Sequence, residues 1–434
     1  MNTYIYPKSV ELFNRAKKVI PRGVYGHLGM TYLTPNDAYP IFGEHAQGAY
    51  FWDVDGNKFI DYMCAFGPNI LGYNDPDVEA AALESLKKGH CTTKPTVKLI
   101  EFAELLVDTI DMADWAMFAK NGNDVTSIAL HIARTATGRR KQILVKGSYH
   151  GSAPWAQTPD KAGINPVDTA DNIYVDWNDI GQIEAAIRDN PGEIACFMST
   201  PYYHPARAPD NVMPAEGYWQ KIRKLCTDNG IVLIIDDVRC CFRMDTGGSD
   251  KYFGFKADLL CICKALANGW NVAALCGTDA LRDASEAAFY TGSFWLSSAP
   301  FAAGIACINK IKKINAIDHM YKIGKLYTDG LVELAKSYGF NLLAMGHPSL
   351  FFLRHDLGNT ELSASMHRFF IAECVKRGVY LTNYNNMFTC YAMTEEDVKF
   401  SLEVADEAYK VVKASNLDQG LLQKYSRTPQ WYPQ

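Results

Sequence analysis

Apolar positions along the first two thirds of the chain follow two alternating patterns. Residues 77–88, 124–137 and 218–228 carry apolar side chains at helical spacing, and Gly138 and Gly230 follow the last two where a helix is expected to end. Between these stretches lie uninterrupted apolar runs at Ile143–Val145, Ile194–Met198, Ile231–Ile235, Leu259–Cys263 and Val272–Cys276. Such runs are typical of strands buried on both faces of a mainly parallel sheet. Strands that alternate with helices predict an α/β domain with helices on both faces of its sheet.

The pattern changes after about residue 305. Helical spacing comes first, short apolar runs follow at 350–353 and 378–381, and a capping box at Thr394–Asp397 opens a last helix that extends to Val412. We expect a smaller α+β domain here, because 434 residues are too many for one core. The predicted organisation is an N-terminal segment, 1–60, that packs with the small domain, a large domain at 61–305, and the small C-terminal domain at 306–434.

Composition limits the classes of partner. Apolar residues make up 48% of the chain and charged residues 21%, and the net charge of −5 does not favour nucleic acid or an anionic membrane as a partner. No apolar run is long enough to span a bilayer, and the first residues lack the apolar region of a secretory signal. The 12 cysteines show no zinc-binding spacing. We therefore expect buried free thiols, no metal site and a cytoplasmic protein.

The first candidate for chemistry is a pair of acids, Asp236 and Asp237, at the end of the apolar run Ile231–Ile235. Ligands of open α/β sheets bind at the carboxyl ends of strands, and an unpaired buried charge is unfavourable. A cationic heterocycle would explain the acid, because a pyridinium nitrogen paired with Asp236 stays protonated and serves as the electron sink of pyridoxal-phosphate chemistry. From this segment alone, an ion pair of an aspartate with Arg239 or Arg243 is an equally good interpretation.

The second candidate is Lys264, which directly follows the apolar run Leu259–Cys263. Ammonium groups avoid burial, and desolvation lowers the pKa of a lysine and makes its amine nucleophilic, as Schiff-base formation requires. Taken alone, a lysine that extends to the edge of the sheet is the better interpretation.

Two turns complete the set. In AKNGNDVTS, Gly122, Asn123 and Asp124 open a helix, whose backbone N–H groups and positive end are suited to a phosphate. In GSYHG, Tyr149 is placed to lie flat over a heterocycle, and His150 to help orient it. Each turn is a weak signal alone. The ordered set of phosphate turn, aromatic residue, acid and lysine, each at one edge of the sheet, predicts a pyridoxal-phosphate site.

These segments resemble the class III aminotransferases, which are fold type I pyridoxal-phosphate enzymes. Further matches are ELFNRAKKVIPRGV, GAYFWDVDGNKFIDY, FGPNILGY and TEEDVKFSLEVADEAY, so the resemblance covers nearly the whole chain. The chain is most similar to the subgroup that contains glutamate-1-semialdehyde aminomutase. The resemblance implies pyridoxal 5′-phosphate as cofactor, with pyridoxamine phosphate as the form between half-reactions.

The resemblance also implies roles for single residues. Lys264 matches the Schiff-base lysine, which also moves protons, and Asp236 matches the acid that pairs with the ring nitrogen. Val238 would pack on the ring face opposite Tyr149. Ser293 matches a threonine that reaches the phosphate from the partner subunit, so a homodimer with shared active sites is implied.

Departures from the family pattern fall mainly on the substrate side. Gly29 stands where the aminomutase has a substrate-binding arginine, which argues against glutamate semialdehyde as substrate. Thr200 stands where glutamate is usual, and Asn123 where serine or threonine is usual. Residues at or near changed positions predict an aromatic substrate wall. Arg239 and Arg243 are the nearest cations for a substrate carboxylate, and an ion pair of either with Asp237 is the alternative. The wall candidates are Tyr25, His27, Phe66, Tyr202, Tyr203, His204 and Trp295, for which packing at the dimer interface is an equally weighted alternative.

The sequence therefore predicts an aminotransferase. It would move an amino group between an amino compound of apolar or aromatic character and a keto acid or aldehyde. An isomerase, either an aminomutase or an amino-acid racemase, uses the same residues and is the alternative. A non-catalytic homologue that only binds the cofactor is disfavoured, because it would have no need of Lys264.

Overall fold

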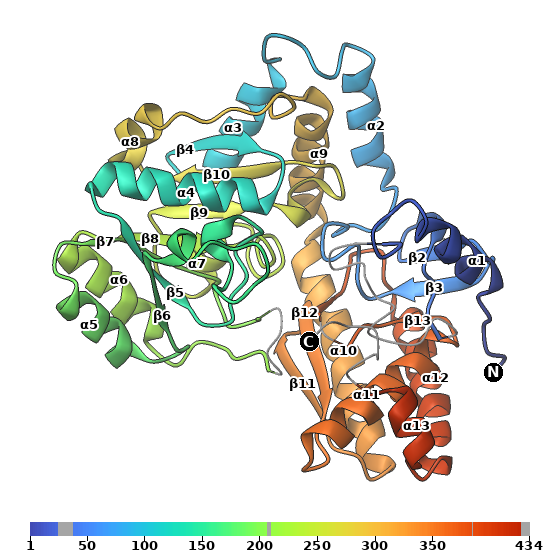
Figure 1. Cartoon of the computed structure of the whole chain (residues 1–434). Coiled ribbons are helices and arrows are strands. Elements are labelled where there is room, and N and C mark those ends of the chain that lie inside the picture. Colours follow the sequence, from blue (N-terminus) through green and yellow to red (C-terminus); the bar gives the residue numbers. More distant parts are fainter. Residues whose placement is uncertain (25–37, 206–209, 384, 427–434) are drawn as a thin grey trace. The chain divides into compact units, whose positions relative to one another are not determined.

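The computed structural model of the chain describes residues 1–24, 38–205, 210–383 and 385–426. The chain forms two compact units, whose elements are labelled in Figure 1. The small unit comprises Met1–Phe66, Leu71–Asn74 and Asp318–Gln434, and the large unit comprises Gly67–Ile70 and Asp75–Ile317.

A seven-stranded sheet forms the centre of the large unit. Its strands, in spatial order, are β4 (Trp115–Ala119), β10 (Ala273–Gly277), β9 (Leu259–Ile262), β8 (Val232–Asp236), β7 (Ile194–Ser199), β5 (Lys141–Val145) and β6 (Asn172–Val175). All pairs from β9 to β6 are parallel, which confirms the predicted mainly parallel sheet. Strand β10 is antiparallel to both neighbours, because the segment that joins it to β9 is shorter than the dozen or so residues of a parallel crossover.

Helices connect these strands. They are α2 (Pro76–Leu86), α3 (Lys98–Thr109), α4 (Gly122–Thr137), α5 (Ile180–Asp189), α6 (Tyr218–Asn229), α7 (Ser249–Tyr252), α8 (Arg282–Ala287) and α9 (Ser298–Ile314). The helices predicted at 77–88, 124–137 and 218–228 are α2, α4 and α6, and their ends differ from the prediction by one or two residues.

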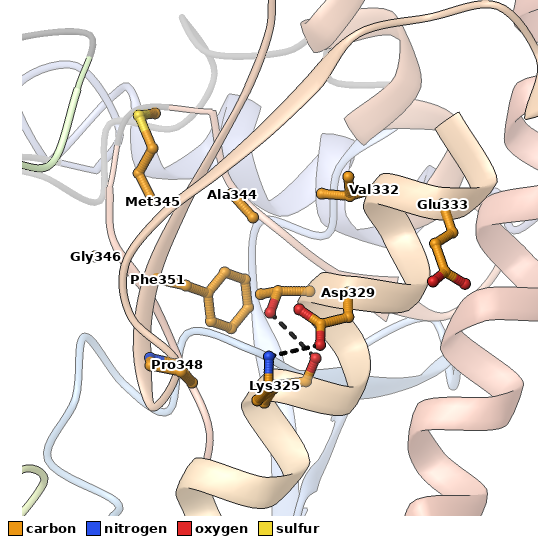
Figure 2. Close-up of a pocket in the computed structure, with 10 residues that line it drawn as sticks. Lys325, Asp329, Val332, Glu333, Ala344, Met345, Gly346, Pro348 and Phe351 are labelled. Carbon is orange, nitrogen blue, oxygen red and sulfur yellow. Dashed lines mark hydrogen bonds and ion pairs between the residues drawn. The ribbon is translucent and has the colours of Figure 1, made fainter. Parts of the chain in front are cut away.

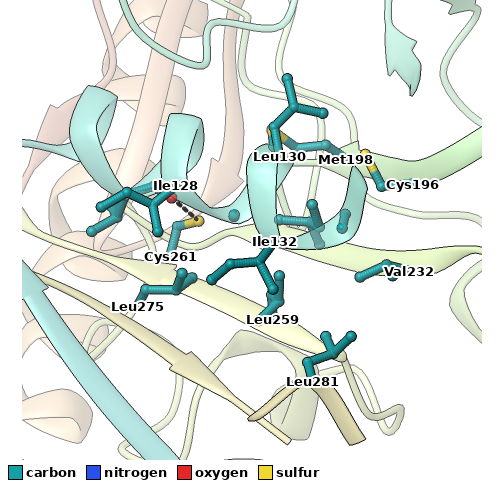
Figure 3. Close-up of a cluster of buried hydrophobic side chains, with 14 of the residues drawn as sticks. Ile128, Leu130, Ile132, Cys196, Met198, Val232, Leu259, Cys261, Leu275 and Leu281 are labelled. Atoms are coloured by element: carbon teal, nitrogen blue, oxygen red, sulfur yellow. Dashed lines mark hydrogen bonds between the residues drawn. The ribbon is translucent and has the colours of Figure 1, made fainter. Parts of the chain in front are cut away.

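Helix α4 is the element that brings the predicted phosphate turn to the sheet. Asn121 and Asp124 form a capping box at its start, and Gly138 ends it with a left-handed conformation at φ 66°. Its apolar face, which includes Ile128 and Ile132, packs in one buried cluster with residues of β7 to β10 (Figure 3). Each fully buried side chain of this size contributes about 1.5–3 kcal/mol, so the packing fixes α4 firmly on the sheet.

The small unit contains two further sheets. One has the order β1 (Gly43–Gln47), β2 (Tyr50–Asp53), β3 (Lys58–Asp61) and β13 (Val379–Tyr380), and the other has the order β11 (Leu342–His347), β12 (Leu350–His355) and β14 (Met387–Phe388). Since β13 pairs in parallel with β3, the N-terminal strands and the C-terminal part of the chain share one sheet. The helices are α1 (Pro7–Ala16), α10 (Ala316–Ser337), α11 (Thr360–Val375), α12 (Glu395–Ala414) and α13 (Gln419–Lys424).

Two sequence expectations are tested by these elements. The predicted capping box opens α12, where the Thr394 hydroxyl accepts a hydrogen bond from the Asp397 backbone N–H at 3.2 Å. All cysteines are free thiols, and all except Cys91 and Cys263 are buried, as predicted. Within the described residues, no helix has the length and apolar character needed to cross a membrane.

Candidate active site

A cavity of about 470 Å³ opens at the carboxyl ends of the large-unit strands, within the range of about 300 to 1,000 Å³ that is usual for small-molecule sites. Its wall is made by residues at or after the ends of β4, β5, β7, β8 and β9, by the segment that precedes β10, and by Pro68. They are Pro68, 120–124, 149–152, Thr200, His204, Asp236, Val238, Arg239, Cys263, Lys264 and 269–272. The structure thus brings together the predicted lysine, acid, aromatic residue and helix turn.

Lys264 begins a short 3-10 turn, Lys264–Ala267, which is separated from the end of β9 by Cys263 alone. Its φ of 44° is in the left-handed region that residues other than glycine rarely adopt, and such strain is often found at functional sites. Burial, together with the nearby Arg239, lowers the pKa of Lys264 to about 8. No described side chain forms an ion pair or hydrogen bond with its Nζ. The amine is therefore available to react just above neutral pH.

Asp236 is the last residue of β8 and is held in a fixed orientation. Its Oδ2 lies 2.8 Å from Nδ1 of His150, and its Oδ1 accepts a hydrogen bond from the backbone N–H of Val238 at 3.3 Å. Asp236 and His150 are only 5% and 4% exposed. The neighbouring Asp237 does not line the cavity, and its carboxyl oxygens accept hydrogen bonds from the backbone N–H and hydroxyl of Ser249.

The turn at the start of α4 offers backbone groups rather than side chains to an anion. The Asp124 carboxylate accepts from the backbone N–H of Asn121 at 2.9 Å and of Lys120 at 3.2 Å. The Asn123 side-chain oxygen accepts from the backbone N–H groups of Ser152 and Ala153, both at 2.8 Å. Asp124, a predicted phosphate ligand, therefore shapes the turn. The groups that remain to bind an anion are the first backbone N–H groups of α4, at the positive end of the helix.

Tyr149 and Val238 supply flat or apolar surface to the cavity. Tyr149 is 50% exposed and lines the cavity. Val238 also lines it and lies against the start of α4, where a Cβ atom on Gly122 would come within 3.0 Å of the Val238 Cγ2. Gly122 therefore permits the close approach of α4 to Val238.

Arg239 and His204 form a polar contact in the cavity wall. The Arg239 Nη1 donates to the His204 carbonyl oxygen at 3.1 Å and lies 3.2 Å from His204 Nδ1. Burial and the neighbouring guanidinium hold the pKa of His204 well below its usual value, so the ring is neutral. Its Nδ1 then accepts from Arg239, and its Nε2 faces the Cys240 Sγ at 3.5 Å.

The predicted aromatic wall is mostly absent from the described cavity. Tyr202 is fully buried, and Trp295 packs against the core cluster, so neither lines it. Phe66 belongs to the small unit, while Tyr25 and His27 lie outside the described residues. The loop conformations that decide where these side chains point depend on packing that the sequence pattern does not reveal.

Ser293 lies outside the cavity, whereas Lys120 lines it. Ser293 is exposed and does not line the cavity, and its carbonyl oxygen lies 3.5 Å from the Cys91 Sγ. The apolar pattern gives no sign that Lys120 belongs to the site; its place two residues before Gly122 in the phosphate turn is the available signal. Burial lowers the pKa of Lys120 to about 8, and its Nζ makes no hydrogen bond to the described residues.

A second hollow, in the small unit, lacks comparable chemistry (Figure 2). It is lined by residues of α10, β11 and β12 and by Pro348 between the two strands. Its lysine, Lys325, is paired with Asp329 at 2.8 Å on the same helix. No reactive amine is therefore left unpaired in the described part of this hollow.

The large-unit cavity fits pyridoxal phosphate. It combines an oriented acid at the end of β8, an unpaired lysine at the end of β9, an exposed aromatic ring and the positive end of a 16-residue helix. These groups match the ring nitrogen, the aldehyde, the flat ring and the phosphate of that molecule. Fold and cavity together define the class of fold type I pyridoxal-phosphate enzymes.

Comparison with known proteins supports this class. The family model described as aminotransferase class-III matches residues 32–346. The aminopentol aminotransferase of Sphingopyxis macrogoltabida is 37% identical over 405 residues, which are 93% of this chain and 94% of the relative. The glutamate-1-semialdehyde 2,1-aminomutase of Methanocaldococcus jannaschii is 29% identical over 430 residues, covering 93% and 98%. A solved structure of the FumI protein of Sphingopyxis sp. MTA144, in its PLP internal aldimine form, has a TM-score of 0.90 at 36% identity and covers 94% and 97%.

The chain belongs to the class III aminotransferase family. It is a pyridoxal-phosphate-dependent aminotransferase that acts on small-molecule amines and carbonyl compounds. The family, the cofactor and the reaction class predicted from the sequence are confirmed.

Proposed function

We propose that Lys264 carries the cofactor and moves the proton during amino transfer, while Asp236 holds the ring nitrogen. The observation that carries the proposal is the placement of the two side chains. An unpaired amine and an oriented carboxylate line one cavity at the ends of β9 and β8, which are adjacent parallel strands. Gly122 and Asn123, at the start of α4, would hold the phosphate through their backbone N–H groups.

Bound pyridoxal phosphate supplies an electron sink for the carbon that bears the substrate amino group. Lys264 removes the proton from that carbon at Nζ, which its lowered pKa of about 8 allows near neutral pH. Asp236, oriented by His150, keeps the ring nitrogen protonated. Tyr149 and Val238 would hold the ring flat between them.

We propose an amino donor with an apolar body rather than glutamate semialdehyde. Gly29 replaces the arginine by which the aminomutase binds that substrate. The cavity wall includes Trp270, Val272 and Pro68 as well as Tyr149. The 37% identical relative, which is named for an aminopentol, supports an amine as the donor.

An isomerase is the second candidate, and the 29% identical aminomutase is the observation that favours it. An aminomutase or racemase would use Lys264 and Asp236 in the same roles. It differs in its product, because the nitrogen stays on the molecule that brought it.

We also propose a homodimer in which Ser293 reaches the cofactor phosphate of the partner subunit. Ser293 is exposed and lies outside its own cavity. Large apolar side chains near it in sequence are exposed, with Phe289 at 88% and Phe294 at 67%. Exposed apolar side chains of this size often mark a surface that a partner covers. Sedimentation should show a dimer, and Phe294→Glu should shift it toward monomer.

The many reduced thiols support a cytoplasmic location.

A half-reaction tests the main proposal. Cofactor-loaded protein is mixed with a panel of α-, β- and ω-amines without an acceptor, and the visible absorbance and released carbonyl are followed. We expect one amine to bleach the absorbance and release one carbonyl per site, and Lys264→Ala to bind the cofactor without releasing any. If only an isomer of the added amine appears, transfer of the amino group to a second molecule is wrong. If Lys264→Ala releases carbonyl as the wild type does, the proposed role of Lys264 is wrong.

A further inference from the structure

Arg239 presents an unpaired cation to the cofactor cavity. Both of its hydrogen bonds to described residues use Nη1 and end on His204. Among those residues no acid pairs with it, and its Nε and Nη2 make no hydrogen bond. The edge formed by Nε and Nη2, which suits a negatively charged oxygen, is therefore free for a ligand in the cavity that Arg239 lines.

The order of strands indicates which side of the cavity Arg239 occupies. Strand β4 leads to Gly122 at the phosphate turn, and β7 leads to His204; these two strands lie on opposite sides of β8, which ends in Asp236. Because Arg239 is bound to His204, its guanidinium lies on the β7 side. The phosphate end of the cavity lies on the β4 side.

The covalent structure of pyridoxal phosphate relates these two sides. Its ring nitrogen and the carbon that a lysine holds lie at opposite ends of the ring. The phosphate arm and the phenolic oxygen project from opposite edges between those ends. With the nitrogen at Asp236, the reactive carbon at Lys264 and the phosphate at Gly122, the edge that carries the phenolic oxygen faces the β7 side.

We propose that Arg239 is a positioning residue that donates hydrogen bonds to the phenolic oxygen of the cofactor, and that His204 orients its guanidinium. The inference rests on the proposed placement of the cofactor between Asp236 and Lys264. A fixed positive charge beside the nitrogen of Lys264 disfavours protonation of that nitrogen. When the cofactor is bound to Lys264, this nitrogen therefore stays unprotonated to a lower pH in the presence of Arg239 than in its absence.

The groups around Lys264 and Arg239 shift the pKa of Lys264 in the directions that the proposal requires. Burial is the largest cause of the lowered pKa of Lys264, Arg239 is the next, and Asp236 acts in the opposite direction. His204 is neutral, so it adds no charge of its own. The other ionisable groups that act on Arg239, His204 or Lys264 are Tyr149, His150, Tyr202, Cys240, Arg243 and Cys263.

The test is a pH titration of the visible absorbance of cofactor-loaded protein without substrate. Arg239→Met and Arg239→Gln remove the charge, whereas Arg239→Lys keeps it. We expect the titration midpoint to rise by about one pH unit or more in the Met and Gln variants and to stay near the wild-type value in the Lys variant. Arg188→Met is the matched control, because Arg188 is exposed and paired with the adjacent Asp189. The absorbance also reports that each variant is folded and loaded.

An unchanged midpoint in both neutral variants would overturn the inference. If those variants keep the midpoint and raise KM only for carboxylate-bearing substrates, Arg239 binds substrate instead, as the sequence first indicated. The proposed function is tested separately by Lys264→Ala. If wild-type absorbance does not depend on Lys264, the placement of the cofactor fails, and the role of Arg239 fails with it.

Discussion

Loss of the hydrogen bond between His150 and Asp236 should slow the reaction, because it releases the Asp236 carboxylate from its fixed orientation. The two atoms are 2.8 Å apart, and the side chains are 3% and 7% exposed. A hydrogen bond to a buried charged group contributes about 1.5–3 kcal/mol. At 1.36 kcal/mol per tenfold change in rate, full loss in the transition state lowers kcat/KM by roughly ten- to a hundredfold.

Two variants separate the hydrogen bond from the shape of the ring. His150→Phe keeps a flat ring but removes the donor, whereas His150→Asn restores an N–H near the position of Nδ1. We expect the Phe variant to show the full loss of kcat/KM at saturating cofactor and the Asn variant to recover most of it. A Phe variant within twofold of the wild type, or an Asn variant as slow as the Phe variant, would refute the reasoning.

Three further predictions concern pH, the phosphate turn and the core. Burial raises the pKa of Asp237 to about 8 from an ordinary value of 3.8. Between these two pH values the folded protein keeps a proton that the unfolded chain releases. The free energy of unfolding therefore falls as the pH rises through this range. In urea unfolding, the free energy of unfolding of Asp237→Asn should rise relative to that of the wild type from pH 5 to 8. A difference between the two proteins that does not change with pH would contradict this. In Gly151→Ala the new Cβ would lie 2.4 Å from the Asn123 Oδ1 at a φ of 120°, so the Kd of the cofactor should rise about tenfold. Gly163→Ala is the control, because Gly163 also has a positive φ but lies in open space. An equal rise in that variant would contradict a role of the Asn123 turn in cofactor binding. Ile132→Ala should lower the free energy of unfolding by about 2–5 kcal/mol in urea without changing kcat, and a loss below 1 kcal/mol would show that the core is not packed as described.

The elements around the site could be predicted where local chemistry determines them. Helix α4 shows this, because its apolar spacing and Gly138 were readable from the sequence and its capping residues begin it at the sheet edge. Lys264 and Asp236 were also readable, since each directly follows an uninterrupted apolar run that became a buried strand. The carboxyl ends of adjacent parallel strands necessarily lie together, so their grouping needed no knowledge of distant contacts.

Side-chain direction in the loops could not be predicted. Tyr202 and His204 are two residues apart after β7, yet Tyr202 is fully buried and His204 lines the cavity beside Arg239. The same holds for Asn123, whose side chain is engaged by the backbone of Ser152 rather than directed at an anion. These outcomes depend on contacts between segments that are distant in sequence, which apolar spacing does not encode.

Chemical reduction of the cofactor-loaded enzyme with borohydride, followed by mass spectrometry of its peptides, tests the central claim most directly. Reduction fixes the cofactor to the residue that carries it. The cavity is lined by two lysines of lowered pKa, Lys264 and Lys120, so the experiment has a built-in comparison. We predict that the added mass is found on the peptide that contains Lys264 and is absent from the peptide that contains Lys120. Added mass on Lys120, or on neither lysine, would contradict the account.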